Sequence, residues 1–352
     1  MQNSLNRRSF LKLVSYFSMS ATTGAIFSCE PKKKPATLGL GRIDVHHHIL
    51  PPDYIAAMKR IGKNVVGGAT IPDWNIQNSL DVMDKNEIAA AFTSMPFVYL
   101  GDLPLTPDFA RRCNEFSARL VSDHPKRFGS FAVLPLPDVE AALRELEHAI
   151  DKLKLDGIVL STNVGGYYLG APEFDELFYE LNRRKQVVFI HPIDPPGECL
   201  PDLKLPTSHI EFVFDTTRAI ANLIYSGTLE SCPDIQFIVA HAGGTVPYLA
   251  WRISLLQYKA GMKKKVPQGP INYLKRLYYD TALSASPYAL RSLQELVDPS
   301  HILIGSDYPF ATEPLTSISI KGLKNYEDFD EQALKAIDHG NALKLFPRLR
   351  IG

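Results

Sequence analysis

The sequence has few cysteines, and they show none of the spacings of a common metal or disulfide motif. The four lie at positions 29, 113, 199 and 232 without any C-x-x-C pair, which argues against a zinc ribbon and a disulfide scaffold. A surplus of one charge is also lacking, because 38 Lys and Arg balance 38 Asp and Glu. This excludes a typical nucleic-acid binder, which needs a basic surplus to meet the phosphates. No apolar run reaches about 18 residues, which excludes a multi-pass membrane protein.

The composition that remains is that of an ordinary globular protein. The chain has 352 residues, of which 45% are hydrophobic and 22% are charged, enough apolar surface for a large core. Its length is more than twice that of a typical domain of about 150 residues. Closed α/β barrels, however, use about 250 residues or more as a single unit. The length is therefore compatible with one large domain.

The first residues of the chain have the composition of an export signal. Residues 6–12 (NRRSFLK) are basic, and residues 13–27 are moderately apolar. A basic start, an apolar centre and a small residue before the cleavage point are typical of a signal peptide. The arginine pair followed by Phe-Leu-Lys resembles a twin-arginine signal. Residues 26–29 (IFSC) resemble a bacterial lipobox, in which Cys29 is lipidated.

We therefore expect residues 1–28 to be a twin-arginine or lipoprotein-type signal peptide, residues 29–41 a linker and residues 42–349 the folded domain. The expected location is the periplasm or, if Cys29 is lipidated, a bacterial membrane to which the lipid tethers the protein peripherally. The alternative is a frayed amphipathic helix that contains an arginine pair by chance.

From residue 42 onward, short apolar runs alternate with amphipathic helical stretches. Near-continuous apolar strands between helices indicate βαβ units and a parallel sheet buried on both faces. Eight such runs predict a closed (β/α)8 TIM barrel with its active site at the C-terminal ends of the strands. The alternative is an open doubly wound sheet, but no G-x-G-x-x-G follows an early strand. The predicted strands are 43–48, 91–96, 129–134, 157–162, 187–192, 237–242, 277–283 and 302–309.

Three consecutive histidines close the first predicted strand. Side chains alternate faces along a strand, so His46 and His48 point one way and His47 points the other. Two neutral imidazoles on one face can share a cation such as zinc. Taken alone, this H-x-H pattern fits a solvated histidine cluster equally well.

Further candidate ligands close three other predicted strands. His191 ends the fifth strand, His241 the sixth and Asp307 the eighth. Each of these residues on its own is compatible with a satisfied core side chain. The carboxyl ends of all barrel strands meet at one mouth, so their coincidence predicts a metal site there. Asp280, in the seventh strand, faces either this mouth or a neighbouring backbone.

These residues lie in motifs that resemble the amidohydrolase superfamily. The motifs are residues 43–51 (IDVHHHILP), 240–244 (AHAGG) with Pro247 and Arg252, 305–310 (GSDYPF) and 340–342 (GNA). The resemblance spans residues 42–349. It is closest to the decarboxylase branch that includes aminocarboxymuconate semialdehyde decarboxylase and 6-methylsalicylate decarboxylase.

The resemblance implies roles for individual residues. It implies that His46, His48, His191 and Asp307 hold one divalent metal, with zinc expected and manganese as the alternative. His241 is implied as the catalytic acid/base. Asp307 is a second catalytic candidate, because a carboxylate that ligates the metal can also shuttle a proton. The binuclear hydrolases of the superfamily often carry a lysine on strand four, whereas residues 160–163 here read LSTN, which favours a single metal.

Substrate binding is expected from two further residues. Arg252 resembles the arginine that reaches the substrate carboxylate in a neighbouring subunit, which implies a homodimer. Asn163 follows the fourth strand, where it can line the pocket; the alternative is a glycine-rich turn with aromatic packing.

The resulting hypothesis is a metal-dependent, non-oxidative decarboxylase. Its substrate would be a small aromatic or unsaturated carboxylic acid, such as a hydroxybenzoate. His241 would either protonate the carbon that bears the carboxylate or activate water. One alternative is a hydrolase, a lactonase or an amidase, with the same ligands. A second alternative is an exported metal-binding or sugar-binding lipoprotein without catalysis, against which the additional His241 argues.

The leader motifs generate a prediction about export. Replacing Arg7 and Arg8 with lysine is expected to retain the precursor in the cytoplasm, because the twin-arginine route reads the arginine pair itself. Cys29→Ala is expected to release the exported protein from membranes. Cell fractionation with immunoblotting measures both effects. Normal export of the lysine variant would contradict the twin-arginine assignment, and a soluble periplasmic wild type would contradict the lipid anchor alone.

Overall fold

The computed structural model describes residues 41–96, 105–197 and 203–349. The predicted signal peptide, the linker up to residue 40 and the candidate lipidation site Cys29 lie outside the described residues. The described part carries an eight-stranded sheet in which every strand pairs in parallel with its neighbours. In spatial order, the strands are β1 (Arg42–His48), β4 (Ile88–Ser94), β5 (Phe128–Ala132), β6 (Gly157–Ser161), β9 (Val187–His191), β10 (Gln236–Val239), β11 (Tyr278–Asp280) and β12 (Ile302–Leu303).

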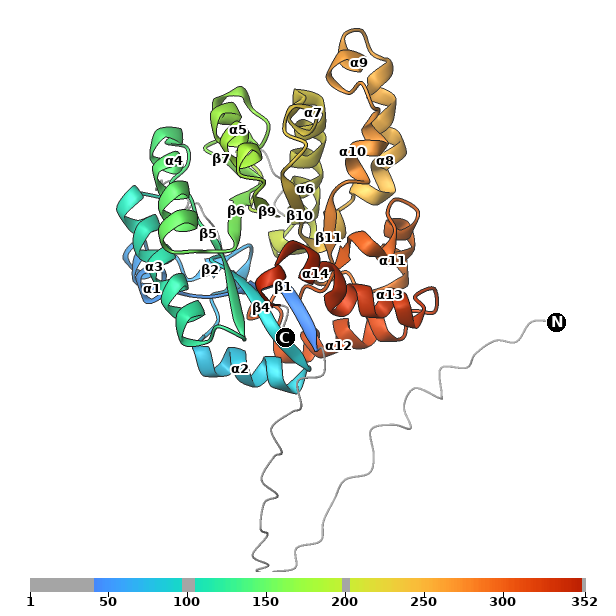
Figure 1. The fold of residues 1–352 in the computed structure, drawn as a ribbon. Helices are drawn as coiled ribbons and strands as arrows, with labels where there is room; N and C mark the ends of the chain where they lie inside the picture. Colours follow the sequence, from blue (N-terminus) through green and yellow to red (C-terminus); the bar gives the residue numbers. More distant parts are fainter. Residues whose placement is uncertain (1–40, 97–104, 198–202, 350–352) are drawn as a thin grey trace, which may run out of the picture. The chain divides into compact units, whose positions relative to one another are not determined.

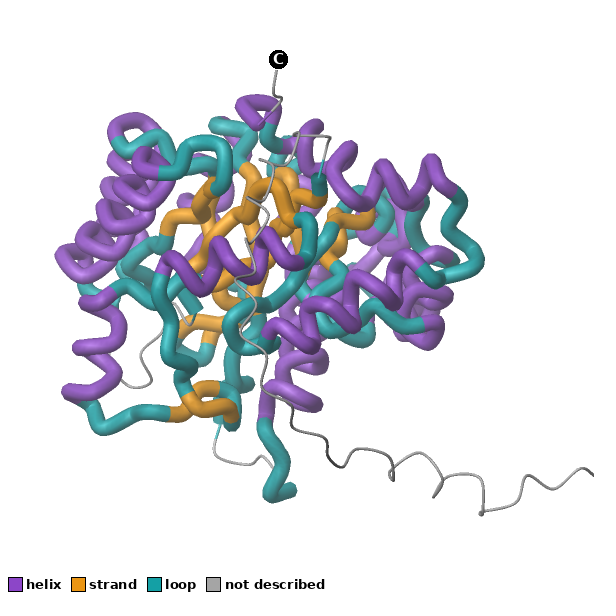
Figure 2. Tube along the Cα trace, turned by 90° about the horizontal axis from the view of Figure 1, so that it is seen from below, coloured by secondary structure: helices purple, strands orange, loops and turns teal. Residues whose placement is uncertain are grey.

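The sheet closes on itself between its first and last strands. Residues at and beyond the end of β12 form parallel bridges to β1, which join Asp44 to Ile304 and His47 to Tyr308. The backbone N–H of His48 also donates to the Tyr308 carbonyl at 2.6 Å. Figure 2 shows the strands gathered inside a layer of helices. The predicted (β/α)8 barrel is therefore confirmed.

The helices lie outside the strands, as Figure 1 shows. Two short hairpins, β2 (Val65–Val66) with β3 (Ala69–Thr70) and β7 (Asn163–Val164) with β8 (Tyr167–Tyr168), lie in the connections. The helices are α1 (Pro52–Arg60), α2 (Ile76–Lys85), α3 (Pro107–Asp123), α4 (Val139–Glu147), α5 (Asp175–Arg183), α6 (Thr207–Ser226), α7 (Thr228–Ser231), α8 (Val246–Ser254), α9 (Met262–Lys265), α10 (Pro270–Leu274), α11 (Pro287–Gln294), α12 (Glu313–Lys324), α13 (Glu331–Lys335) and α14 (Asn341–Leu345).

Local sequence explains where several of these helices begin. The Thr106 side chain accepts a hydrogen bond from the Phe109 N–H, and Pro107 occupies the first turn of α3. Asn75 and Asp138 cap α2 and α4 in the same manner. Such caps satisfy backbone N–H groups that have no partner within the helix, and proline loses nothing at this position.

Three strands end at least three residues earlier than the sequence pattern predicts. The sixth, seventh and eighth predicted strands reach residues 242, 283 and 309, whereas β10, β11 and β12 end at Val239, Asp280 and Leu303. His241 and Asp307 have φ angles of 55° and 62°. This left-handed conformation is incompatible with an extended strand. The backbone therefore turns at His241 and Asp307, which are two of the candidate site residues.

The two long connections after β1 and β9 meet on the C-terminal side of the barrel. The Ser208 N–H at the start of α6 donates to the Gly67 carbonyl in the β2–β3 turn at 2.9 Å. A Cβ at Gly68, whose φ is 80°, would lie 2.5 Å from the Pro206 Cα. Only glycine allows this approach. The contact joins the loops that follow the first and fifth strands.

Aromatic side chains fill the barrel interior. The rings of Phe92 and Phe346 stack with centroids 3.7 Å apart, and those of Phe131 and Phe189 are 5.4 Å apart. The Phe189 ring also lies edge-on to His46, with the centroids separated by 4.9 Å. This packing gives the first histidine of the H-x-H motif a rigid support. Within the described residues, the helices are too short or too polar to cross a membrane.

Candidate metal centre

The H-x-H histidines face the barrel interior together. The Nε2 atoms of His46 and His48 are 3.1 Å apart, and both side chains are buried. His47 points the other way, where its ring nitrogens lie 3.1 Å from an Asp44 carboxylate oxygen and 3.0 Å from the Ser79 hydroxyl. The structure thus separates the three consecutive histidines as strand alternation predicts. His47 is part of the packing between β1 and α2.

Asp307 meets these histidines from the other side of the barrel seam. Its Oδ1 lies 3.2 Å from His46 Nε2 and 3.0 Å from His48 Nε2, while its Oδ2 lies 3.5 Å from His241 Nε2. Its backbone N–H donates to the His46 carbonyl at 2.8 Å, which fixes its position. Burial raises the pKa of Asp307, but the His46 charge and hydrogen bonds from the surrounding imidazoles outweigh it and hold the pKa well below its usual range. The carboxylate is therefore ionised.

His191 and His241 complete the cluster from β9 and from the turn after β10. The rings of His191 and His46 are 5.0 Å apart, and those of His191 and His241 are 5.6 Å apart. His191 Nδ1 lies 2.7 Å from the Pro192 carbonyl, to which it donates. This bond places the proton on Nδ1, so that Nε2 carries the lone pair of the neutral ring.

Asp280 holds two members of the cluster at once. Its Oδ2 accepts from His46 Nδ1 at 2.8 Å, and its Oδ1 accepts from the backbone N–H of His241 at 2.9 Å. The sequence left open whether Asp280 faces the mouth or a backbone, and the structure shows that it does both. A Cβ at Gly305 would lie 3.0 Å from the Asp280 carboxyl carbon and 3.0 Å from the His46 Cβ. Glycine at this position lets the backbone just beyond β12 pass close to the cluster.

Two further contacts support the cluster and were not predicted from the sequence. Asp44 accepts from the backbone N–H and the hydroxyl of Ser306, which fastens the end of the barrel to its first strand. The Ser94 hydroxyl lies 3.1 Å from His48 Nδ1. In the sequence, only their positions hint at these two contacts. Ser94 ends the strand beside β1, and Asp44 lies two residues before the first of the three histidines.

The donor set fits a divalent cation. His46, His191, His241 and Asp307 are buried, and each places one ligand atom within 4.8 Å of the other three. His48 joins them through its contacts with His46 and Asp307. Atoms that bind one ion at about 2.1 Å lie roughly 3.0 to 3.4 Å apart. The 3.0 to 3.2 Å separations among His46, His48 and Asp307 agree with this.

Electrostatics also favour a cation at this position. Burial lowers the pKa of His48, and burial together with the neighbouring imidazoles lowers the pKa of His191 well below its ordinary value. Both rings are therefore neutral, which is the form that binds metals. Burial lowers the pKa of His46 as well, but Asp280 and Asp307 outweigh it and raise the pKa to about 10. The two carboxylates thus stabilise a positive charge here, which a divalent cation supplies as well as a proton does.

The other predicted site residues lie in different settings. The Asn163 amide nitrogen donates to Asp215 Oδ2 at 3.0 Å and to the Asp194 carbonyl at 3.2 Å, so it supports the turn after β6. Arg252 lies exposed on α8 and is not a member of the cluster. Substrate binding by these two residues stays a prediction.

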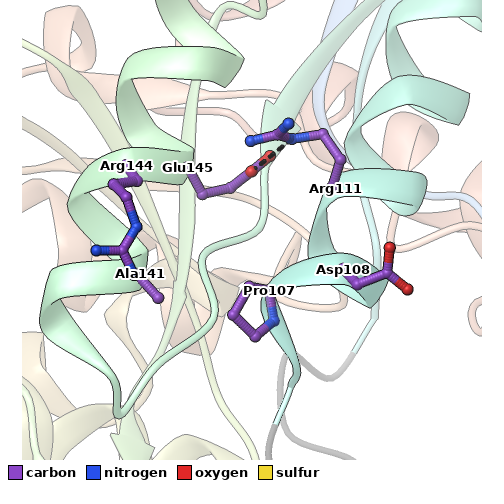
Figure 3. Close-up of a pocket in the computed structure, with 6 residues that line it drawn as sticks. All are labelled: Pro107, Asp108, Arg111, Ala141, Arg144 and Glu145. Carbon is purple, nitrogen blue, oxygen red and sulfur yellow. Dashed lines mark hydrogen bonds and ion pairs between the residues drawn. The ribbon is translucent and has the colours of Figure 1, made fainter.

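A separate hollow lies between α3 and α4, as Figure 3 shows. It encloses about 250 Å³. Its central charges are already paired, because Arg111 Nε donates to Glu145 Oε2 at 2.8 Å, and Asn114 donates to the other oxygen of Glu145. None of the predicted site residues lines it. The lining residues are Pro107, Asp108, Arg111, Ala141, Arg144 and Glu145.

Known proteins share this chain's sequence and fold. The amidohydrolase family matches residues 43–348. The decarboxylase yanB of Aspergillus niger is 35% identical over 328 residues, 89% of each chain. The 6-methylsalicylic acid decarboxylase of Penicillium expansum is 34% identical over 88% of this chain and 98% of its own. The crystal structure of a Polaromonas dihydroxybenzoic acid decarboxylase with bound manganese and 2-nitroresorcinol matches the fold, with a TM-score of 0.73 and 23% identity over 88% of this chain and 98% of its own.

The cluster geometry generates a prediction about metal content. His191→Ala is expected to reduce bound metal from about one equivalent per subunit to a small fraction, because it removes a buried donor. His47→Ala is expected to keep the metal but to destabilise the fold by about 1–3 kcal/mol, because buried Asp44 and Ser79 lose a partner. Elemental analysis and thermal melting measure the two effects. Equal metal loss in both variants would contradict the assignment, as would two equivalents in the wild type.

Proposed function

The chain belongs to the amidohydrolase family and is a non-oxidative carboxy-lyase within it, and we propose that it removes the carboxylate from a hydroxylated aromatic acid. The observation that carries this proposal is the buried cluster of imidazoles around Asp307 at the barrel mouth. The named substrate of the 34% identical relative, 6-methylsalicylic acid, supports an ortho-hydroxybenzoate as the substrate class. Hydrolysis of a lactone or an amide is the alternative for the same donor set.

We assign the metal to His46, His48, His191 and Asp307, and the proton transfer to His241. The contacts with Asp307 support this division. His46 and His48 lie 3.2 and 3.0 Å from Oδ1, whereas His241 lies 3.5 Å from Oδ2. The metal would be zinc or manganese, and the Polaromonas decarboxylase with bound manganese supports the second choice. Such an ion, when bound, supplies a Lewis acid for the substrate oxygens.

The proton transfer follows from the chemistry of the lost group. Before the bond to the carboxylate breaks, the ring carbon that bears it must gain a proton. The two electrons of the breaking bond then return to the ring, and CO2 leaves. His241 is the proposed donor, because its Nε2 faces the cluster, and no hydrogen bond to a described residue holds its buried Nδ1. The donated proton stays on the ring in place of the carboxylate, so His241 must take a new proton from solvent, which Asp307 Oδ2, beside His241 Nε2, would relay to it.

A homodimer is proposed from the exposed face of α8. Tyr248 and Trp251 on this helix are 82% and 71% exposed, and Leu255 just beyond it is 43% exposed. Large apolar side chains in a row on one helix face are typical of a protein interface. Arg252 is exposed beside them, so that a partner subunit docked on this face would receive its guanidinium. We propose that Arg252 binds the substrate carboxylate in the partner's site, and that Asn163 lines the pocket of its own.

We also propose that residues 1–28 direct export and that Cys29 carries a lipid. The sequence motifs are the support for this location. The twin-arginine route suits a metal enzyme that folds before export. Ligands from strands far apart in the chain come together only after folding.

The acid/base assignment predicts a separation of metal binding from turnover. His241→Asn is expected to keep the metal and to lower the turnover rate by about 100- to 10,000-fold, because it removes a proton-transfer group. CO2 release from 6-methylsalicylate measures this, with ring opening of an aromatic lactone assayed in parallel. A wild type that opens the lactone and releases no CO2 would contradict the decarboxylase. Full activity of the variant would contradict the role of His241.

The shared site predicts complementation between subunits. Arg252→Ala and His241→Asn proteins are each expected to be inactive, and mixing them is expected to restore partial activity. A mixed dimer then has one site with an intact His241 and an intact partner arginine. Activity after subunit exchange and sedimentation measure this, with Lys259→Ala as an exposed control. A monomer, or mixtures without restored activity, would contradict the proposal.

A further inference from the structure

The side chain of Ser161, at the end of β6, faces the interior of the barrel. Side chains alternate along a strand, and the neighbours of Ser161 show which face each one takes. Val159 packs in the same cluster as interior Phe189, and Leu160 packs in the other main cluster, with the helices. The Thr162 hydroxyl donates to Asp215 on α6, which lies outside the strands. Ser161 therefore has the inward orientation of Val159.

Its position along the strand places it beside the metal centre. In the pairing of β6 with β9, Ser161 is directly opposite His191. Residues opposite each other on neighbouring strands have side chains on the same face. The Ser161 hydroxyl thus lies next to the imidazole of His191 at the barrel mouth.

This hydroxyl is buried, and no described residue is a hydrogen-bond partner for it. Ser161 is 2% exposed, and among the described residues its Oγ has no hydrogen-bond partner. Most buried polar groups are hydrogen-bonded, because an unpaired one lowers the stability of the fold. A donor left unpaired at a functional mouth is therefore available for a ligand.

We propose that Ser161 is a substrate-binding residue whose hydroxyl donates a hydrogen bond to an anionic oxygen of the aromatic acid. The inference rests on the proposed function. The composition of the mouth supports it, because the other side chains gathered there are the imidazoles and the carboxylate assigned to the metal and to proton transfer. The groups assigned to the metal would bind a cation, so they leave few donors for an anion within the same subunit. The hydroxyl supplies such a donor and favours substrates with an oxygen at that position.

The test compares two variants that each remove a buried hydroxyl without a partner. Ser161→Ala removes the proposed donor. Thr316→Val removes a hydroxyl of the same kind, 1% exposed and unpartnered among the described residues, on α12 in the outer layer. Neither change should lower the melting temperature, because each deletes an unpaired polar group from the interior.

The probe is 2-nitroresorcinol, which cannot lose CO2, and its binding to metal-loaded protein is measured by calorimetry. Ser161→Ala is expected to weaken binding by about 10- to 100-fold, the effect of losing a hydrogen bond to a charged oxygen. Thr316→Val is expected to bind like the wild type. Resorcinol, which lacks the nitro group, is the second probe. A loss shared by both probes places the bond on the phenolic oxygen, and a loss confined to 2-nitroresorcinol places it where the carboxylate would be.

The remaining outcomes overturn one claim or both. Unchanged binding to Ser161→Ala overturns the role of Ser161 and leaves the proposed function standing. Weaker binding together with a lower melting temperature in Ser161→Ala also overturns it, because the hydroxyl would then be structural. A wild type that binds neither probe, and that releases no CO2 from 6-methylsalicylate, overturns the proposed function and this inference with it.

Discussion

Four imidazoles and one carboxylate are buried at one end of the barrel, and the unfavourable desolvation of these groups governs the structure around them. A buried polar group without a partner is costly, and a buried charge without a counter-charge more so. Asp280 reduces this cost by accepting hydrogen bonds from the His46 ring and from the backbone N–H of His241. Asp44 acts similarly on the opposite face of β1, where it contacts His47 and Ser306. The site is rigid because its supports are themselves buried.

The same requirement shapes the backbone. His241 and Asp307 lie in left-handed conformations, which residues with side chains seldom adopt. Such strain persists where surrounding contacts over-determine it, and it concentrates at functional sites. Here the contacts are Asp280 to the His241 N–H and the His46 carbonyl to the Asp307 N–H. Ending the strands early is therefore the means by which these two side chains turn toward the cluster.

The two oxygens of the Asp307 carboxylate contact different members of the cluster. One oxygen of Asp307 faces the H-x-H pair and the other faces His241. With one oxygen toward the proposed ligands and one toward the proposed proton donor, Asp307 would couple ion binding to proton transfer. On β6, the strand that pairs with β9, the residue opposite His191 is Ser161, whose side chain is a neutral hydroxyl. Such a neutral donor can contact an anionic substrate without competing for the ion.

The sequence alone determined the features that depend on local periodicity and on side-chain chemistry. The alternation of apolar runs predicted eight parallel strands, and the period of two in β1 predicted that His47 would face away from His46 and His48. His191, His241 and Asp307 could be found because imidazoles and a carboxylate are distinctive at the ends of apolar strands. These inferences needed no knowledge of which strand lies beside which.

Only the tertiary structure decided the contacts made across the closed barrel. Asp280 meets His46 across 234 positions of sequence, and Ser306 meets Asp44 across 262. No pattern in either segment encodes the other, because closure of the sheet creates the pairing. The true ends of β10 and β12 also depend on contacts across the barrel, since Asp280 holds the left-handed turn at His241 and the His46 carbonyl holds the one at Asp307. Local chemistry thus identified the candidate ligands, and barrel closure set their orientation and their supports.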